Sequence, residues 1–196
     1  MTTETVSLTF DSVLRVLVPP GERAFVRLAA GQGRHDEAER YYRRLGNHWA
    51  ALDQQGGGLE DFVAMYQAQG VRFSPVAWGS WTTPAPMLFS HAVWVGTPAR
   101  VSNGVKPPSV AIDEGDRIVS LWLLRQPITD PASLKSALHA LARTLHGDLA
   151  LIEPNQALVS IPGSRVVSAP PARTVEVVHW DPTRTYDAEK IITKGG

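Results

Sequence analysis

The feature that most constrains the fold is a nearly unbroken apolar run from residue 118 to residue 124, which reads IVSLWLL. A strand covered on one face alternates apolar and polar side chains, whereas a strand covered on both faces is apolar almost throughout. The run is therefore predicted to be a central strand of a sheet. The acidic sequence DEGD at 113–116 is typical of a turn, so it predicts a hairpin that joins this strand to the β-rich segment 109–112.

A capped amphipathic helix is predicted directly after this strand. Asp130 is a favourable N-cap residue, Pro131 suits the first turn, and Gly147 is predicted to end the helix. An apolar stripe at helical spacing would pack the helix against the sheet. The stripe consists of Leu134, Leu138, Leu141 and Leu145.

The other segments predict further short elements of both types. The triple glycine at 56–58 has no P-loop lysine after it, so it is predicted to be a flexible connection between two helices. Residues 193–196 are predicted to fray. Helices are predicted at 11–18, 35–45 and 59–70, and strands at 24–29, 71–78, 91–95, 150–152, 157–161 and 174–180.

Composition limits the classes of protein that the chain can belong to. A length of 196 residues fits one domain, which we assign to 1–192. Lys and Arg number 19, as do Asp and Glu, so the overall charge does not steer the protein towards nucleic acid or anionic lipid. The absence of cysteine excludes disulfides, thiolate nucleophiles and Cys-based metal sites. No segment fits a signal peptide or a membrane span, so a cytoplasmic protein without a membrane partner is predicted.

Motifs of the common enzyme classes are incomplete in this sequence. It contains neither the zinc-binding pattern His-Glu-x-x-His nor the nucleophile turn Gly-x-Ser-x-Gly. The phrase Gly31-Gln32-Gly33 is not continued to a dinucleotide-binding loop, because Asp36 stands where the third glycine is needed. His91 and His179 lie in predicted strands without a partner that sequence spacing can locate. The sequence therefore predicts no metal and no cofactor.

The order of several short phrases resembles the archaeo-eukaryotic primase superfamily, and within it the primase-polymerase domains of plasmids, phages and integrated elements. The phrases are VWV at 93–95, PPSVAI at 107–112, SLWLLRQPIT at 120–129 and SIPGS at 160–164. The resemblance covers nearly the whole chain. It implies an α/β fold of the α+β kind, in which an N-terminal αβ unit packs on a mainly antiparallel sheet like that of an RNA-recognition motif (RRM-like).

The functional residues of that superfamily do not carry over. The resemblance implies two metal-binding aspartates after the first strand, but those positions fall on Gly96 and Pro98. The nucleotide-contacting histidine falls on Val119, the third carboxylate falls near Pro154, and the arginine before the closing phrase is Ser160. Phosphoryl transfer needs carboxylates that hold a pair of divalent metals. The sequence therefore indicates a primase-like domain without catalytic residues, acting as a non-enzymatic component of replication.

Two alternative functions remain open from the sequence. An active primase or polymerase would need relocated carboxylates and Mg²⁺ or Mn²⁺, with Asp113, Glu114, Asp116 and Glu153 as candidate ligands. The simpler interpretation of the acidic turn is a solvated hairpin. An RNA-binding module would use the sheet face.

A nucleic-acid backbone would need a local cluster of cations, because the protein as a whole is neutral. The candidates near the presumed cleft are Arg100, Lys106, Arg117 and Arg165, against the alternative of ordinary surface charge. The partners implied by the resemblance are replication proteins of the same element, with single-stranded DNA as a further candidate.

Overall fold

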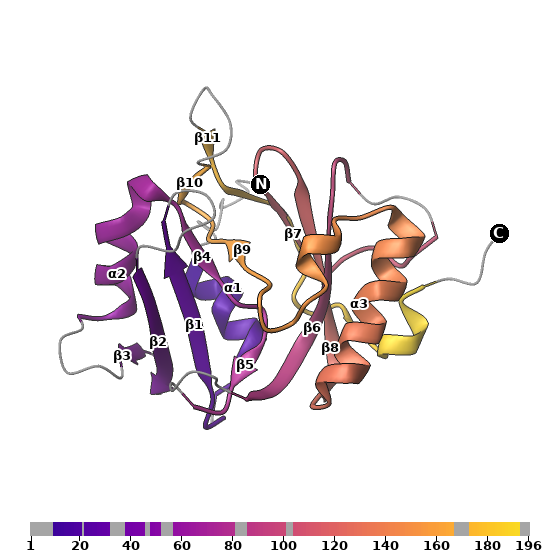
Figure 1. The fold of residues 1–196 in the computed structure, drawn as a ribbon, viewed down its shortest axis with the longest axis horizontal. Coiled ribbons are helices and arrows are strands. Elements are labelled where there is room, and N and C mark those ends of the chain that lie inside the picture. The colour runs from indigo at the N-terminus through magenta and orange to yellow at the C-terminus, as the bar shows by residue number, and fades with distance from the viewer. Residues whose placement is uncertain are drawn as a thin grey trace, which may run out of the picture.

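The computed structural model describes residues 10–20, 22–31, 38–45, 48–51, 57–80, 86–100, 104–166 and 173–192 (Figure 1). Within these ranges no helix is long and apolar enough to span a bilayer. The α-helices are α1 (Phe10–Leu17), α2 (Leu59–Tyr66) and α3 (Pro131–Leu145), and the 3₁₀ helices are η1 (Gln67–Gln69), η2 (Leu149–Leu151) and η3 (Ala188–Lys190). The strands are β1 (Phe25–Ala30), β2 (Ala38–Leu45), β3 (His48–Ala51), β4 (Val71–Phe73), β5 (Ala77–Trp78), β6 (Met87–Thr97), β7 (Val110–Asp113), β8 (Ile118–Ile128), β9 (Val159–Ser160), β10 (Arg165–Val166), β11 (Arg173–Thr174), β12 (Glu176–Trp180) and β13 (Thr185–Tyr186).

The main sheet runs in the order β12-β7-β8-β6-β5-β1-β2-β3, and its pairs are antiparallel except for β13 with β8. β8 lies between β7 and β6, and residues 119–124 are all buried, which confirms the prediction of a central strand. Asp113 pairs with Ile118, so β7 and β8 form the predicted hairpin. The mixed α+β architecture agrees with the predicted fold class.

Helix α3 packs against β6 and β8, and its buried stripe includes Leu134, Leu138 and Leu141. The Asp130 side chain accepts from the backbone N–H groups of Ala132 and Ser133, so it caps the helix as predicted.

The C-terminal end of α3 differs from expectation in one detail. His146, not a glycine, adopts the left-handed conformation with φ of 51°. Gly147 serves a different purpose, because a Cβ built there would lie 2.2 Å from Cγ2 of Val95 in β6. Glycine at this position therefore lets the end of α3 approach the sheet closely.

The structure corrects two predicted elements. The described part of the predicted helix 35–45 is strand β2, which pairs with β1 on one side and β3 on the other. The apolar residues at helical spacing misled the prediction, because Tyr41 and Tyr42 also favour a strand. The ladder with β1 covers residues 38–43 and the ladder with β3 covers residues 42–45, so the whole segment is paired as a strand. The prediction of a strand at 150–152 is also wrong, since residues 149–151 form the 3₁₀ helix η2, which Asp148 caps.

Some predictions fall on residues that the structure does not describe. They concern part of the Gly31-Gln32-Gly33 phrase, the first glycine of the triple glycine and the predicted tail. These residues lie in 32–37, 52–56 and 193–196.

Candidate functional site

Gly96 and Val119, two positions where the resemblance expects catalytic side chains, are register partners on β6 and β8. Register partners project to the same face of a sheet, and successive residues project to opposite faces. Val95 contacts the end of α3, so Gly96 and Val119 belong to the opposite face. Ile112 of β7 is the register partner of Val119, so it lies on the same face. Val119 and Ile112 are fully buried, so this part of the face is apolar and closed.

The space beside Gly96 is already filled. A Cβ built on Gly96 would lie 3.1 Å from Cδ of Arg117 and 3.1 Å from Cδ1 of Leu151. Leu151 is held in place because its carbonyl accepts the indole N–H of the buried Trp94, at 3.0 Å. A carboxylate at residue 96 would therefore compete for room with both side chains.

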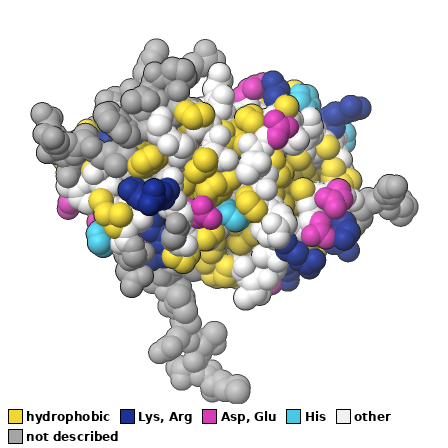
Figure 2. All heavy atoms as spheres, turned by 90° about the horizontal axis from the view of Figure 1, so that it is seen from below, with side chains coloured by type: hydrophobic (Ala, Val, Ile, Leu, Met, Phe, Trp, Pro, Cys, Tyr) yellow, Lys and Arg dark blue, Asp and Glu magenta, His cyan; other side chains and the backbone are white. Residues whose placement is uncertain are grey.

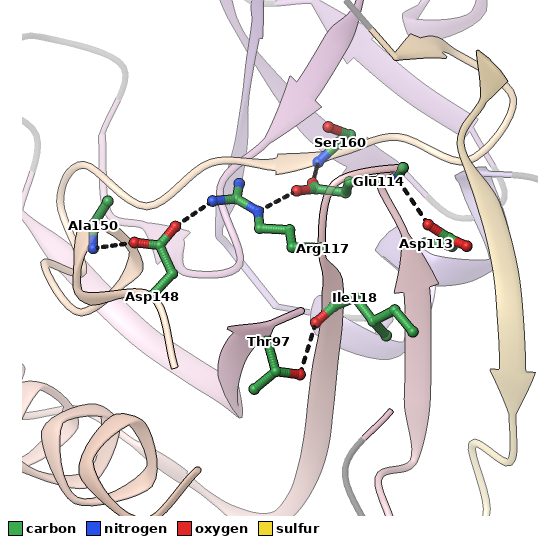
Figure 3. A network of polar contacts seen from close by, with 9 residues as sticks. Thr97, Asp113, Glu114, Arg117, Ile118, Asp148, Ala150 and Ser160 are labelled. Atoms are coloured by element: carbon green, nitrogen blue, oxygen red, sulfur yellow. Dashed lines mark hydrogen bonds and ion pairs between the residues drawn. The ribbon is translucent and has the colours of Figure 1, made fainter. Parts of the chain in front are cut away.

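The guanidinium of Arg117 lies between two carboxylates at this point (Figure 3). Its Nε donates to Oε2 of Glu114 at 2.6 Å, and its Nη1 donates to Oδ2 of Asp148 at 2.5 Å. Burial disfavours the charged form, but the two carboxylates outweigh this and hold the pKa of Arg117 above its ordinary value. We call Glu114, Arg117 and Asp148 the ion-pair triad.

The triad joins segments that are far apart in the sequence. The Glu114 side chain is 5% exposed, and its Oε1 accepts the backbone N–H of Ser160 in β9. The backbone N–H of Asp148 donates to the carbonyl of Gly96 at 2.8 Å, and its Oδ1 accepts the N–H of Ala150. The end of β6, the β7–β8 hairpin, η2 and β9 are therefore fixed to one another through this site (Figure 3).

The candidate relocated ligands do not converge in the structure. Asp113 accepts the N–H of Gly115 and points away from Glu114, from the other side of the hairpin (Figure 3). Asp116 is exposed, and Glu153 forms an ion pair with Lys135 at 2.5 Å. In the part of the chain that the structure describes, no three acidic or histidine side chains are grouped to hold a metal ion. The two carboxylates beside Gly96, those of Glu114 and Asp148, are both engaged by the guanidinium of Arg117. The acidic residues of the site therefore do not fit a pair of divalent metals.

The structure also places three further positions implied by the resemblance. Pro98 is exposed in the bend that follows β6, and Pro154 is buried in the turn after η2. Ser160 pairs with Arg72 of β4 and faces the triad through its backbone. Sequence reasoning missed Asp148, whose only signal was its place directly after the expected helix end at Gly147.

The four candidate nucleic-acid-binding cations are distributed over different elements. Arg100 donates to the carbonyl of Val178 in β12, and Lys106 is exposed where its backbone N–H bonds to the carbonyl of Ile191. Arg117 is held in the triad, whereas Arg165 is exposed in β10, beside the end of α2. On the face drawn in Figure 2, the coloured Lys and Arg side chains lie at separate places among acidic and apolar ones.

The two large indoles of the central strands lie within the core. Trp94 and Trp122 are at most 1% exposed, and the indole N–H of Trp122 donates to the carbonyl of Lys106 at 2.7 Å. Base stacking needs an accessible aromatic face. These two residues therefore do not offer the stacking platform that an RNA-binding sheet would use.

Comparison with solved structures finds the same arrangement of elements in a phage protein. The AEP domain of the cyanophage S-2L primase-polymerase (PrimPol) superposes with a TM-score of 0.58, and the match covers 85% of each chain. The chain has the fold of a primase-polymerase domain. Sequence identity to the cyanophage domain is 12%, so the match concerns the fold alone. No protein-family model and no curated protein matches the sequence.

Proposed function

We propose that this chain is a catalytically inactive primase-like domain that acts as a non-enzymatic component of DNA replication. We place it in the cytoplasm, in the replication machinery of a plasmid, phage or integrated element. Its partners there are single-stranded DNA, replication proteins of the same element, or both. The primase-polymerase fold, found in the cyanophage domain, supports the setting.

The ion-pair triad is the observation that carries the proposal. Two-metal phosphoryl transfer needs several carboxylate oxygens directed at cations that bridge the attacking and leaving oxygens. Here the two carboxylates beside Gly96 are directed at the guanidinium of Arg117. The guanidinium lies 2.5–2.6 Å from the carboxylate oxygens that would bind a divalent cation, so it takes up their hydrogen-bonding positions. Its positive charge also repels such a cation. Arg117 thus balances the carboxylates without supplying any chemistry.

The remaining candidate positions support the same proposal. Gly96 offers no side-chain donor, and Val119 is aliphatic and buried. A strand accepts these residues without cost to the fold, because they remove clustered carboxylates that would repel one another. A domain of this kind retains its sheet edges and its surface for binding.

A primer-synthesis assay tests the proposal. The protein is incubated with a single-stranded template, nucleotides and either Mg²⁺ or Mn²⁺, and we expect no metal-dependent product. A product that is lost in Asp113→Ala or Asp148→Ala, and retained in the exposed control Glu189→Ala, would contradict the proposal. That result would favour an active enzyme with relocated ligands.

A further inference from the structure

A hollow of about 440 Å³ lies between the C-terminal end of α2 and the β10–β11 pair. Figure 1 shows α2 and the β10–β11 pair side by side. This volume lies in the range of pockets that bind small ligands or parts of larger ones. The residues that line it are Ala64, Met65, Gln67, Ala68, Gly163, Arg165, Arg173 and Thr174.

The floor of this hollow is fixed by hydrogen bonds. Gly163 has φ of +88°, which glycine adopts without strain, and no atom of the described residues lies within 4 Å of a Cβ built on it. Its carbonyl accepts the side-chain amide of Gln67 at 2.8 Å, and its N–H donates to the carbonyl of Val175 at 2.9 Å. The buried Ser164 hydroxyl donates to the carbonyl of Ile161 at 2.7 Å. The turn therefore needs little rearrangement to receive a ligand.

The charge of the hollow is positive. Arg165 and Arg173 are exposed, and no carboxylate of the described residues pairs with either guanidinium. The side chain of Met65 adds an apolar surface, since this residue is 66% exposed. Among the residues that the structure describes, no acidic side chain lines the hollow. Two unpaired guanidinium groups beside an apolar surface suit a chain of phosphates with bases attached.

A neighbouring hollow limits the direction in which a bound nucleic-acid strand could run. It begins on the other side of Arg173 and is lined by Asp113 and Glu176 together with Gly115 and Thr174. These carboxylates repel phosphate. The anionic ligand is therefore expected on the side of α2, between Arg165 and Arg173.

We infer that this hollow binds the phosphate backbone of single-stranded DNA, with Arg165 and Arg173 contacting phosphates and Met65 lying against a base. The inference rests on the proposed function, which it deepens by giving the strand a location. It assigns no DNA contact to Arg117.

A purely structural role for the two arginines predicts a different result. The C-terminal end of a helix carries a partial negative charge, and nearby cations stabilise it. In that case their removal would lower the melting temperature and leave DNA binding unchanged. Binding and stability must therefore both be measured on the same variants.

The experiment uses the double variant Arg165→Gln/Arg173→Gln and a matched control, Arg125→Gln/Arg143→Gln, which removes two exposed arginines elsewhere. Fluorescence anisotropy with a labelled oligothymidylate is measured between about 0.05 and 0.2 M salt. Each phosphate contact to a single strand contributes about 0.7 to the slope of log affinity against log salt, so the slope should fall by about 1.4. Affinity at about 0.2 M salt should fall about tenfold. The control variant should bind like the unmodified protein.

Several results would overturn the inference, and they differ in what else they affect. If the unmodified protein binds DNA and the double variant binds equally well, the strand lies elsewhere and the proposed function survives. If only the melting temperature falls, the arginines are structural. If an oligouridylate displaces the labelled oligothymidylate at a clearly lower concentration than unlabelled oligothymidylate does, the ligand is RNA. If the unmodified protein does not bind at low salt, the DNA-binding form of the proposed function fails too, and binding to a replication protein is what remains.

Discussion

Replacing Arg117 by methionine is expected to lower the free energy of unfolding by about 2–3 kcal/mol. Breaking a buried ion pair by removal of one partner costs about 3–5 kcal/mol, because the other charge stays buried and unpaired. The expected loss is smaller than for a fully buried pair, since the side chain of Arg117 is 26% exposed and that of Asp148 is 36% exposed. Most of the lost stability should come from leaving the charge of Glu114 unpaired, because its side chain is only 5% exposed. Urea unfolding measures the change.

Two further variants separate this explanation from a general effect of losing an arginine. Arg125→Met removes a guanidinium that is 62% exposed and 3.7 Å from Asp187, so it should change stability by less than about 0.5 kcal/mol. Glu114→Gln/Arg117→Met should be more stable than Arg117→Met, because the buried charge of Glu114 is removed and only the more exposed Asp148 loses its partner. Equal stability of Arg117→Met and Arg125→Met would show that the triad does not hold the site together.

Replacing Trp94 by alanine is expected to have the largest effect, about 3–5 kcal/mol. This indole is 1% exposed and supports the carbonyl of Leu151, which covers Gly96. Trp94→Phe keeps most of the apolar contact and loses the hydrogen bond, so a loss of about 1–2 kcal/mol is expected. Both values are measured by urea unfolding.

Trp180→Ala provides the control for this prediction. Trp180 lies in the edge strand β12 and is only partly buried, so its removal should cost clearly less than that of Trp94. A loss from Trp94→Ala no larger than that from Trp180→Ala would mean that Leu151 and the closed face do not depend on the indole.

The parts of the fold that could be predicted from the sequence are those with strong local signals. β8 has a nearly unbroken apolar run, and α3 has an N-cap at Asp130 and a regular leucine stripe. β2 could not be predicted, because its apolar residues fit a helix and a strand equally well. The segment forms a strand because it pairs with β1 and β3, and the sequence of β2 alone does not show these pairings. η2 was missed because its cap, Asp148, follows a helix end whose geometry the sequence does not specify.

The candidate site was predictable in position but not in chemistry. Glu114 and Arg117 were both identified, one as a candidate metal ligand and the other as a candidate DNA contact. Their pairing with each other follows from the hairpin geometry, and the second carboxylate, Asp148, lies 31 residues from Arg117 in the sequence. Sequence spacing cannot reveal such a contact, because it depends on how α3 packs against β6. The role of Gly147 in that packing was likewise visible only in three dimensions.

Binding of Mn²⁺ to the unmodified protein, followed by electron paramagnetic resonance of the free ion, tests the central claim most directly. If the guanidinium of Arg117 occupies the oxygens of Glu114 and Asp148, the signal of free Mn²⁺ should be the same with and without the protein. The same result is expected when both samples contain a nucleoside triphosphate at equal concentration. Stoichiometric uptake of Mn²⁺ that disappears in Asp148→Ala would contradict the account.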